Sequence, residues 1–359
     1  MRFPPIAYLE FAKRRLDLEP PRYNLASSGM QPPDWSDLGL ERCTELPLSA
    51  PTPFGYGPLR ERLAARYGLE PAQLLTTSGT SLANFLVCAA LIEPGDDVAL
   101  EWPRYEPLEA VLRGLGARIH RLPRPAETGF QPDLERCDAL LQRGLRLLVL
   151  TDLHNPSAAQ LDEELRVALI ERCARHGSWL LLDEVYLDGV FDRPVTSAAG
   201  RGERVVVTSS LTKTWGLGAL RVGWAVGPAS LVRRMAEIHD HLGVEPPSVT
   251  EAIACRALER LETLTARARR RRAACLPLVR AFAERHGLRW HEPAGGFIAW
   301  LGLPDGRAAR PLSERLRRAF DTQITPGDFF GVPDHVRLGF GAPPEHVSAG
   351  LERFGRALS

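Results

Sequence analysis

The chain has 359 residues, more than one domain usually holds, and its formal net charge is +1. Hydrophobic residues make up 44% and charged residues 25%, which is ordinary for a globular protein. A near-neutral charge gives no reason to expect nucleic acid or a membrane surface as a partner. No apolar run approaches the ~18 residues that span a bilayer, and the N-terminus does not resemble a signal peptide. We therefore expect a soluble, cytoplasmic protein.

The six cysteines include no Cys-x-x-Cys pair and mostly lie in apolar helical contexts. This pattern is typical of buried free thiols in a reducing cytosol. We expect neither a disulfide framework nor a metal site.

The first ~45 residues are rich in proline and show little periodicity, so we expect an arm that wraps over the protein. From Pro58 to Pro228 apolar strands alternate with helices, which is typical of a sheet buried on both faces. The expected strands are 97–102, 118–122, 145–153, 179–186, 204–211 and 222–226. This order predicts an α/β fold with a mostly parallel central sheet flanked by helices.

The pattern changes after Pro228. Residues 231–285 indicate long helices with a break near Pro246, and short strands follow at 297–301 and 335–339. These elements predict a smaller α+β domain. We therefore expect a large α/β domain over 45–245, with 1–44 and 246–359 forming the N-terminal arm and the small C-terminal domain.

Lys213 stands out among the basic residues, because Lys13 is the only other lysine in a chain rich in arginine. It follows an apolar strand, three residues after Ser210, and a glycine-rich stretch and Arg221 come next. Lysine, unlike arginine, can lose its proton in a site that excludes water and attack an aldehyde. The hydroxyls and the arginine together suit a phosphate group. A strand–turn–strand with an outward-pointing lysine is the alternative.

Asp183 ends another apolar strand, and Tyr186 follows three residues later. A buried carboxylate at a strand end can contact a protonated ring nitrogen and so make the ring an electron sink. Helix capping or a salt bridge is the ordinary alternative. Asn155, before Pro156, follows the preceding strand; by itself it indicates only a turn.

Ser78, Gly79 and Thr80 precede an apolar helix. Backbone N–H groups at a helix N-terminus bind anions, and the helix dipole favours them. Simple N-capping by one of the hydroxyls is the alternative. In a C-terminal strand, the planar fork of Arg337 suits a carboxylate, although the residue can equally be a surface charge.

Taken in order, these segments resemble the class I/II aminotransferases, which are fold-type I enzymes that use pyridoxal 5′-phosphate. The serine, two residues, lysine, glycine-rich stretch and arginine around Lys213 match the family's lysine signature, and Asp183 to Tyr186 match its Asp-x-x-Tyr motif. The resemblance covers essentially the whole chain. It implies the fold-type I architecture, a homodimer, and a Schiff base between Lys213 and the cofactor.

The resemblance also implies how the cofactor phosphate is held. Ser210 and Arg221 would bind it from one side. Gly79 and Thr80, with Ser78 adjacent, would bind it at the start of the following helix.

The cofactor ring has its own set of implied contacts. Asp183 would contact the ring nitrogen, and Asn155 and Tyr186 would approach the phenolic oxygen. Tyr105 would stack on the ring; its offset from the preceding proline matches the family better than that of Trp102 does.

Arg337 would bind the α-carboxylate of the substrate, with Asn155 beside it. The implied activity moves an amino group between an α-amino acid and a 2-oxo acid, and Lys213 would move the α-proton. The same residues also serve β-elimination, decarboxylation or a cyclisation, because they form the carbanion and do not choose its fate. A non-catalytic protein that binds the cofactor is a further alternative. No residue indicates the side chain of the substrate.

Some segments depart from the family pattern. Ala158 stands where the family often has glycine, and residues 24–29 fit the family's substrate loop only loosely. The family's tyrosine that reaches the neighbouring subunit falls at Ala50, and Phe54 or Tyr56 is the candidate to replace it.

Other classes of protein lack their signatures here. The Gly-x-Gly-x-x-Gly fingerprint of a nicotinamide dehydrogenase and the Gly-x-Ser-x-Gly elbow of a serine hydrolase are both missing from suitable contexts. An arginine cluster at 267–272 has no interleaved aromatics. We expect it to be a solvated helix face paired with Glu259 and Glu262.

Overall fold

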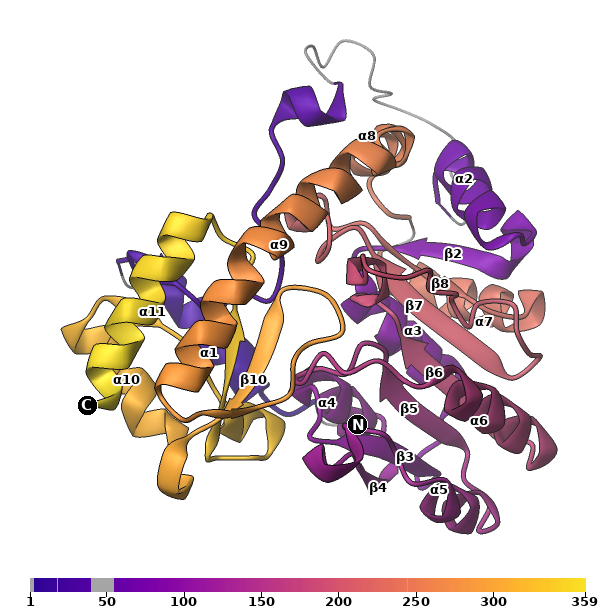
Figure 1. Ribbon diagram of the computed structural model, residues 1–359. Helices are drawn as coiled ribbons and strands as arrows, with labels where there is room; N and C mark the ends of the chain where they lie inside the picture. The colour runs from indigo at the N-terminus through magenta and orange to yellow at the C-terminus, as the bar shows by residue number, and fades with distance from the viewer. Residues whose placement is uncertain (1–2, 18, 40–54, 244) are drawn as a thin grey trace.

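A seven-stranded sheet forms the centre of the large domain in the computed structural model, which describes residues 3–17, 19–39, 55–243 and 245–359 (Figure 1). Its strand order is β2-β8-β7-β6-β5-β3-β4, and only β8 runs antiparallel to its neighbours. The strands are β2 Leu74–Thr77, β3 Asp97–Trp102, β4 Arg118–Pro123, β5 Leu147–Thr151, β6 Trp179–Asp183, β7 Val205–Ser210 and β8 Gly223–Val226. The mostly parallel sheet is confirmed; β2 adds a strand that the sequence reading did not include.

Helices cover both faces of this sheet (Figure 1). One apolar core joins α3, α4 and α7 to one face, and two further cores join α5, α6, α2 and α8 to the other. The helices are α2 Gly57–Tyr67, α3 Thr80–Leu91, α4 Glu106–Gly114, α5 Leu134–Leu141, α6 Glu163–Arg175, α7 Ala229–Asp240 and α8 Ser248–Glu259. Burial on both faces explains why the central strands are almost continuously apolar.

The small domain packs a four-stranded antiparallel sheet, in the order β12-β13-β10-β9, against α9, α10 and α11. These elements are β9 Arg289–Trp290, β10 Ile298–Gly302, β12 Thr325–Pro326, β13 His335–Gly339, α9 Leu261–Arg285, α10 Ala309–Ala319 and α11 Pro344–Leu358. The N-terminal arm joins this domain, since β1 (Tyr23–Asn24) pairs with β11 (Thr322–Gln323). Among the described residues, no helix is long and apolar enough to cross a membrane.

The core of the large domain continues beyond residue 245, the boundary predicted from the sequence. Ile253 and Ala254 of α8 pack with Leu74 and Trp224 of the sheet. From there α9 leads into the small domain, where Cys275 is part of the core (Figure 1). Five of the six cysteines are buried free thiols, as expected, and Cys43 lies outside the described residues.

The arginine cluster on α9 meets one expectation only in part, because Arg269 and Arg270 are exposed as expected but the other three arginines are half-buried. Arg267, Arg271 and Arg272 donate hydrogen bonds to backbone carbonyls of loops at the junction of the two domains. The acceptors are Gln31, Gly341 and Pro293, at 3.0, 3.1 and 2.5 Å. Glu259, the partner expected for the cluster, instead pairs with Arg62 and Arg256. Two of these carbonyls belong to the buried residues Gly341 and Pro293, which need donors, so the guanidinium groups tie α9 to the loops that carry them.

Candidate active site

The carboxyl ends of four adjacent parallel strands meet at one edge of the large sheet. β7, β6, β5 and β3 end at Ser210, Asp183, Thr151 and Trp102. In open α/β sheets, ligands bind in the crevice outside these ends. The topology therefore brings the residues predicted from separate segments to a single place.

A cavity opens at this edge. Its walls come from the strand ends, from α3, and from the N-terminal arm. It is lined by Ser28, Thr80, Ser81, Asn84, Tyr105, Thr151, Asn155, Asp183, Val185, Tyr186, Ser210, Thr212, Lys213 and Arg221. Every predicted site residue lines it except Ser78, Gly79 and Arg337, each of which contacts a residue of the lining.

Lys213 lies in the turn after β7 and is the amine of this cavity. Its Nζ donates a hydrogen bond to the hydroxyl of Ser28, at 3.0 Å. Ser28 belongs to the N-terminal arm and is buried. The arm therefore forms a wall of the site, a role that the loose match of residues 24–29 to the family loop only hinted at.

Asp183 is a buried carboxylate, 4% exposed, that forms no ion pair within the described residues. Its Oδ2 accepts from the Asn84 side chain at 2.8 Å, and its Oδ1 accepts from the Val185 N–H at 3.1 Å. Burial raises the pKa of Asp183 to about 6, although these two hydrogen bonds and the charge of Lys213 act in the opposite direction. Such a carboxylate suits a ligand that brings an N–H⁺ group.

Groups that suit an anion gather where α3 begins. Gly79 has a φ of +83°, and a Cβ there would lie 2.4 Å from Nη2 of Arg221, so only glycine lets the guanidinium come this close. The Thr80 hydroxyl is buried, with no hydrogen-bond partner in the described part of the chain. Ser210 and the free N–H groups of α3 complete the site. Ser78 contributes its carbonyl, which accepts from Arg221 at 3.5 Å, and its side chain does not line the cavity.

Arg337 is 1% exposed on β13 of the small domain. Its Nη1 donates to Oδ1 of Asn155 at 2.9 Å, and its Nη2 donates to the hydroxyl of Tyr8 at 2.7 Å. The backbone N–H of Asn155 in turn donates to Thr151 Oγ1, at 2.8 Å. The guanidinium thus reaches across from the small domain to the rim of the cavity.

Tyr8 comes from α1 (Ala7–Asp17), a helix of the N-terminal arm. Glu106 accepts hydrogen bonds from the backbone N–H groups of Ala7 and Tyr8, at 3.2 and 2.6 Å, and so fixes the start of α1 against α4. The Tyr8 ring meets the Tyr105 ring edge-on, with 5.8 Å between the centroids. Sequence reasoning missed Tyr8, because nothing in the proline-rich arm indicates that it reaches the site.

The structure also distinguishes Tyr105 from Trp102, the two candidates for stacking on the cofactor ring. Tyr105 is in the cavity wall, and burial raises its pKa well above the ordinary value. Trp102 does not line the cavity and instead contacts two guanidinium groups, those of Arg104 and Arg121, at 4.6 and 3.8 Å from its ring centroid. This favours Tyr105 as the stacking residue.

Two positions that depart from the family pattern, Ala158 and the candidates for the cross-subunit tyrosine, can be compared with the structure. Ala158 has a φ of +58°, in the left-handed region that favours glycine, which accounts for the family's usual residue there. Ala50 and Phe54 lie outside the described residues. Tyr56 precedes α2, and its N–H donates to Glu251 at 2.6 Å.

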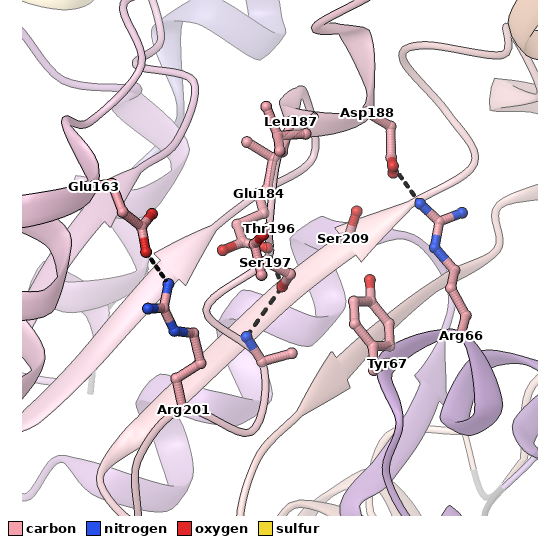
Figure 2. A pocket seen from close by; sticks show the side chains of 12 residues that line it. Arg66, Tyr67, Glu163, Glu184, Leu187, Asp188, Thr196, Ser197, Arg201 and Ser209 are labelled. Carbon is pink, nitrogen blue, oxygen red and sulfur yellow. Dashed lines mark hydrogen bonds and ion pairs between the residues drawn. The ribbon is translucent and has the colours of Figure 1, made fainter. Parts of the chain in front are cut away.

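A larger cavity lies on the opposite face of the sheet (Figure 2). Its charged groups face one another: Arg66 binds Asp188, Arg201 binds Glu163 at 2.5 Å, and Glu184 accepts from Ser197 and from the Ala198 N–H. Its charged side chains therefore already have partners, and none of the predicted site residues lies in it.

The two cavities differ in how well their residues fit pyridoxal phosphate. The orphaned hydroxyl of Thr80, the close approach of Arg221 to Gly79, and the unpaired carboxylate of Asp183 match a phosphate and a protonated ring nitrogen. Lys213 supplies the amine. The residues at the strand ends thus fit the cofactor that the sequence motifs predicted.

The model of the family "Aminotransferase class I and II" matches residues 35–354, and the chain belongs to this family. It is 33% identical over 304 residues to an arginine–pyruvate transaminase of Pseudomonas aeruginosa, covering 80% of this chain and 77% of that protein. It is 32% identical over 329 residues to a capreomycidine synthase of Streptomyces vinaceus, covering 89% and 84%.

Solved structures agree with this assignment. A PLP-dependent aminotransferase from Streptococcus suis superposes with a TM-score of 0.92 over 100% of this chain and 98% of that one, at 23% identity. A PLP-dependent cyclase, OrfR, gives a TM-score of 0.88 at 27% identity, over 100% and 98%. The chain is accordingly a pyridoxal-phosphate-dependent aminotransferase of fold type I.

Proposed function

We propose that Lys213 carries the cofactor and moves the proton in a transfer of an amino group between an α-amino acid and a 2-oxo acid. The observation that supports this most directly is the position of Lys213 Nζ in the same cavity as the carboxylate of Asp183. When bound, pyridoxal phosphate supplies an electron-accepting ring that stabilises the charge left after the α-proton is removed.

The residues around this amine divide the remaining tasks. Arg337 binds the α-carboxylate of the substrate through its planar fork, and its hydrogen bond to Asn155 fixes the orientation of that fork. Lys213 Nζ takes the α-proton of the substrate and would return it to the cofactor carbon that is bonded to the substrate nitrogen. Asp183 keeps the ring nitrogen protonated, while Asn155 and Tyr186 contact the ring oxygen.

The remaining contacts hold the cofactor itself. Thr80, Ser210, Arg221 and the N–H groups after Gly79 bind its phosphate, with Ser78 adjacent. Tyr105 covers one face of the ring, which also excludes water from that side.

For the substrates, we propose arginine as the first amino donor to test and pyruvate as the acceptor. The name of the Pseudomonas relative states this pair for that protein, which is 33% identical to this chain. A cyclisation on the same cofactor is the second candidate. It is favoured by the similarity to a capreomycidine synthase and to the cyclase OrfR.

We further propose a cytoplasmic homodimer, because the family's sites lie at a subunit interface. The cavity found here is lined in part by Ser28 of the N-terminal arm. Sedimentation of the purified protein tests the assembly, and a monomer with full activity contradicts it.

A visible spectrum of the purified protein, recorded before and after amino acids are added without any oxo acid, tests the reaction. We expect the band of the bound cofactor to convert to the pyridoxamine form with arginine, and released 2-oxo acid to match it. A cyclic product with no 2-oxo acid favours the second candidate, and pyruvate from a donor with a β-leaving group indicates β-elimination. A protein that cannot be reconstituted with the cofactor contradicts the proposal.

A further inference from the structure

Asn84 is a buried polar residue on an otherwise apolar helix. It is 3% exposed on α3, whose other buried residues include Ala83, Leu86 and Val87. Burying an amide among apolar groups is costly unless both of its ends form hydrogen bonds. Neither the family motifs nor the functional assignments above give this residue a task.

Both ends of the Asn84 amide do form hydrogen bonds. Nδ2 donates to Oδ2 of Asp183 at 2.8 Å, and Oδ1 accepts from the hydroxyl of Thr208 at 2.6 Å. Thr208 lies on β7 directly beside Asp183 on β6, since the two residues are paired in register. All three side chains are at most 4% exposed.

This arrangement fixes which way the amide points. An ionised carboxylate can only accept hydrogen bonds, so the NH₂ end of Asn84 must face Asp183. The oxygen end then faces Thr208, whose hydroxyl must donate. Thr208 thus orients Asn84. Asp183 accepts two hydrogen bonds, one from Asn84 and one from the Val185 N–H.

The consequence falls on the charge of Asp183. Burial favours the neutral carboxyl, whereas each hydrogen bond donated to the carboxylate favours the charged form. Without Asn84, one backbone N–H and the more distant charge of Lys213 are left to oppose burial. A neutral Asp183 is a much weaker partner for a protonated ring nitrogen.

We propose that Asn84 is a positioning residue that keeps Asp183 ionised and aimed at the cofactor ring, and that Thr208 orients Asn84 for this task. The inference rests on the proposed assignment of Asp183 to the ring nitrogen. Asn84 itself acts on the reaction only through Asp183.

The test compares two ligands that differ at the ring nitrogen. The full-length protein is reconstituted either with pyridoxal phosphate or with its analogue that carries CH in place of that nitrogen, and the two dissociation constants are measured. The wild type should prefer pyridoxal phosphate by roughly tenfold or more, because a charged hydrogen bond is lost with the analogue. Asn84→Leu should reduce this preference by roughly three- to tenfold.

Two further variants keep the test independent of folding. Thr208→Val preserves the shape of the side chain and should reduce the preference in the same direction, but less. Ser209→Ala is the matched control, because Ser209 is the next residue on β7 and faces the opposite cavity (Figure 2); its preference should equal that of the wild type. In an Asp183→Asn background, Asn84→Leu should change nothing further.

The outcomes separate the inference from the assignment on which it rests. If the wild type discriminates and Asn84→Leu discriminates equally well, the inference is overturned while the role of Asp183 stands. Equal loss of affinity for both ligands shows a merely structural residue and overturns it as well. If the wild type binds both ligands equally, Asp183 does not contact the ring nitrogen, and both statements fall.

Discussion

Two cavities share the ends of β6 and β7 but face opposite sides of the sheet. Because side chains alternate along a strand, Asp183 and Ser210 line one cavity, whereas their neighbours Glu184 and Ser209 line the other. The cavity of Glu184 is the larger, about 470 Å³ against about 60 Å³. Size alone would therefore select the wrong side.

The difference lies in the pairing of the polar groups. On the Glu184 side two arginines pair with carboxylates, Arg66 with Asp188 and Arg201 with Glu163, and Glu184 itself accepts from Ser197 and the Ala198 N–H. On the Asp183 side the buried Thr80 hydroxyl has no hydrogen-bond partner within the described residues, and the Lys213 amine meets a serine hydroxyl instead of a carboxylate. A binding site is recognised by hydrogen-bonding capacity that the protein leaves unused.

Lys213→Ala should have the largest effect. It removes the amine that holds the cofactor and moves the proton, so turnover should fall by roughly a thousandfold or more. The assay is the initial rate of 2-oxo acid formation with cofactor in excess. A variant that retains a tenth of the wild-type rate contradicts the assignment of the cavity.

Arg337→Lys should come next. Lysine keeps the charge but loses the planar fork, along with the hydrogen bonds to Asn155 and Tyr8. We expect the KM for the amino acid to rise by roughly tenfold to a hundredfold. Arg201→Lys, on the other side of the sheet, is the matched control and should leave KM unchanged. A similar change of KM in both variants would remove the distinction between the cavities.

The sequence predicted most of the residues that line the cavity on the Asp183 side, because several of them follow apolar strands. A lysine or carboxylate directly after a buried strand is visible as a change of pattern, and parallel strands carry such ends to one edge. The strand alternation predicted the large sheet for the same reason. The small β2 was missed because four residues are too short for a period to show.

The sequence did not show which residues reach the active site from distant parts of the chain. Ser28 and Tyr8 reach the site through the fold of the arm, which no local pattern encodes. Asn84 had a signal, a single amide on an apolar helix face, but the same signal also fits a residue at the surface. The arginine cluster on α9 was misread because charge patterning reveals carboxylate partners and not backbone carbonyls.

Tyr8→Phe should have a moderate effect. It removes the hydroxyl that accepts from Arg337 and leaves the ring contacts with Tyr105 in place. We expect KM for the amino acid to rise by roughly three- to tenfold, with a smaller change in kcat. Tyr67→Phe is the control, because Tyr67 lines the opposite cavity and its hydroxyl accepts a hydrogen bond from Trp224 at 2.9 Å. Its KM should stay at the wild-type value; a kcat loss in Tyr8→Phe without a KM change would exclude the positioning role.

Glu184→Gln should have the smallest effect on catalysis and should act on stability alone. Burial raises the pKa of Glu184 from 4.5 to about 8, against the hydrogen bonds from the Ala198 N–H and Ser197. Between these values the native protein holds a proton that the unfolded chain has lost, so the free energy of unfolding falls as pH rises. Glutamine resembles the protonated glutamate and removes this contribution.

The thermal midpoint of Glu184→Gln, relative to wild type, should therefore increase from about pH 5 to about pH 8.5. The kinetic constants should match those of the wild type at both pH values, because Glu184 lines the opposite cavity and not the cofactor cavity. A difference in midpoint that is constant with pH would show that Glu184 titrates near its ordinary value in the folded protein. A large loss of kcat would instead show that the two faces of the sheet are coupled through the Asp183–Glu184 pair, and the contrast between the cavities would no longer separate a chemical site from a structural one.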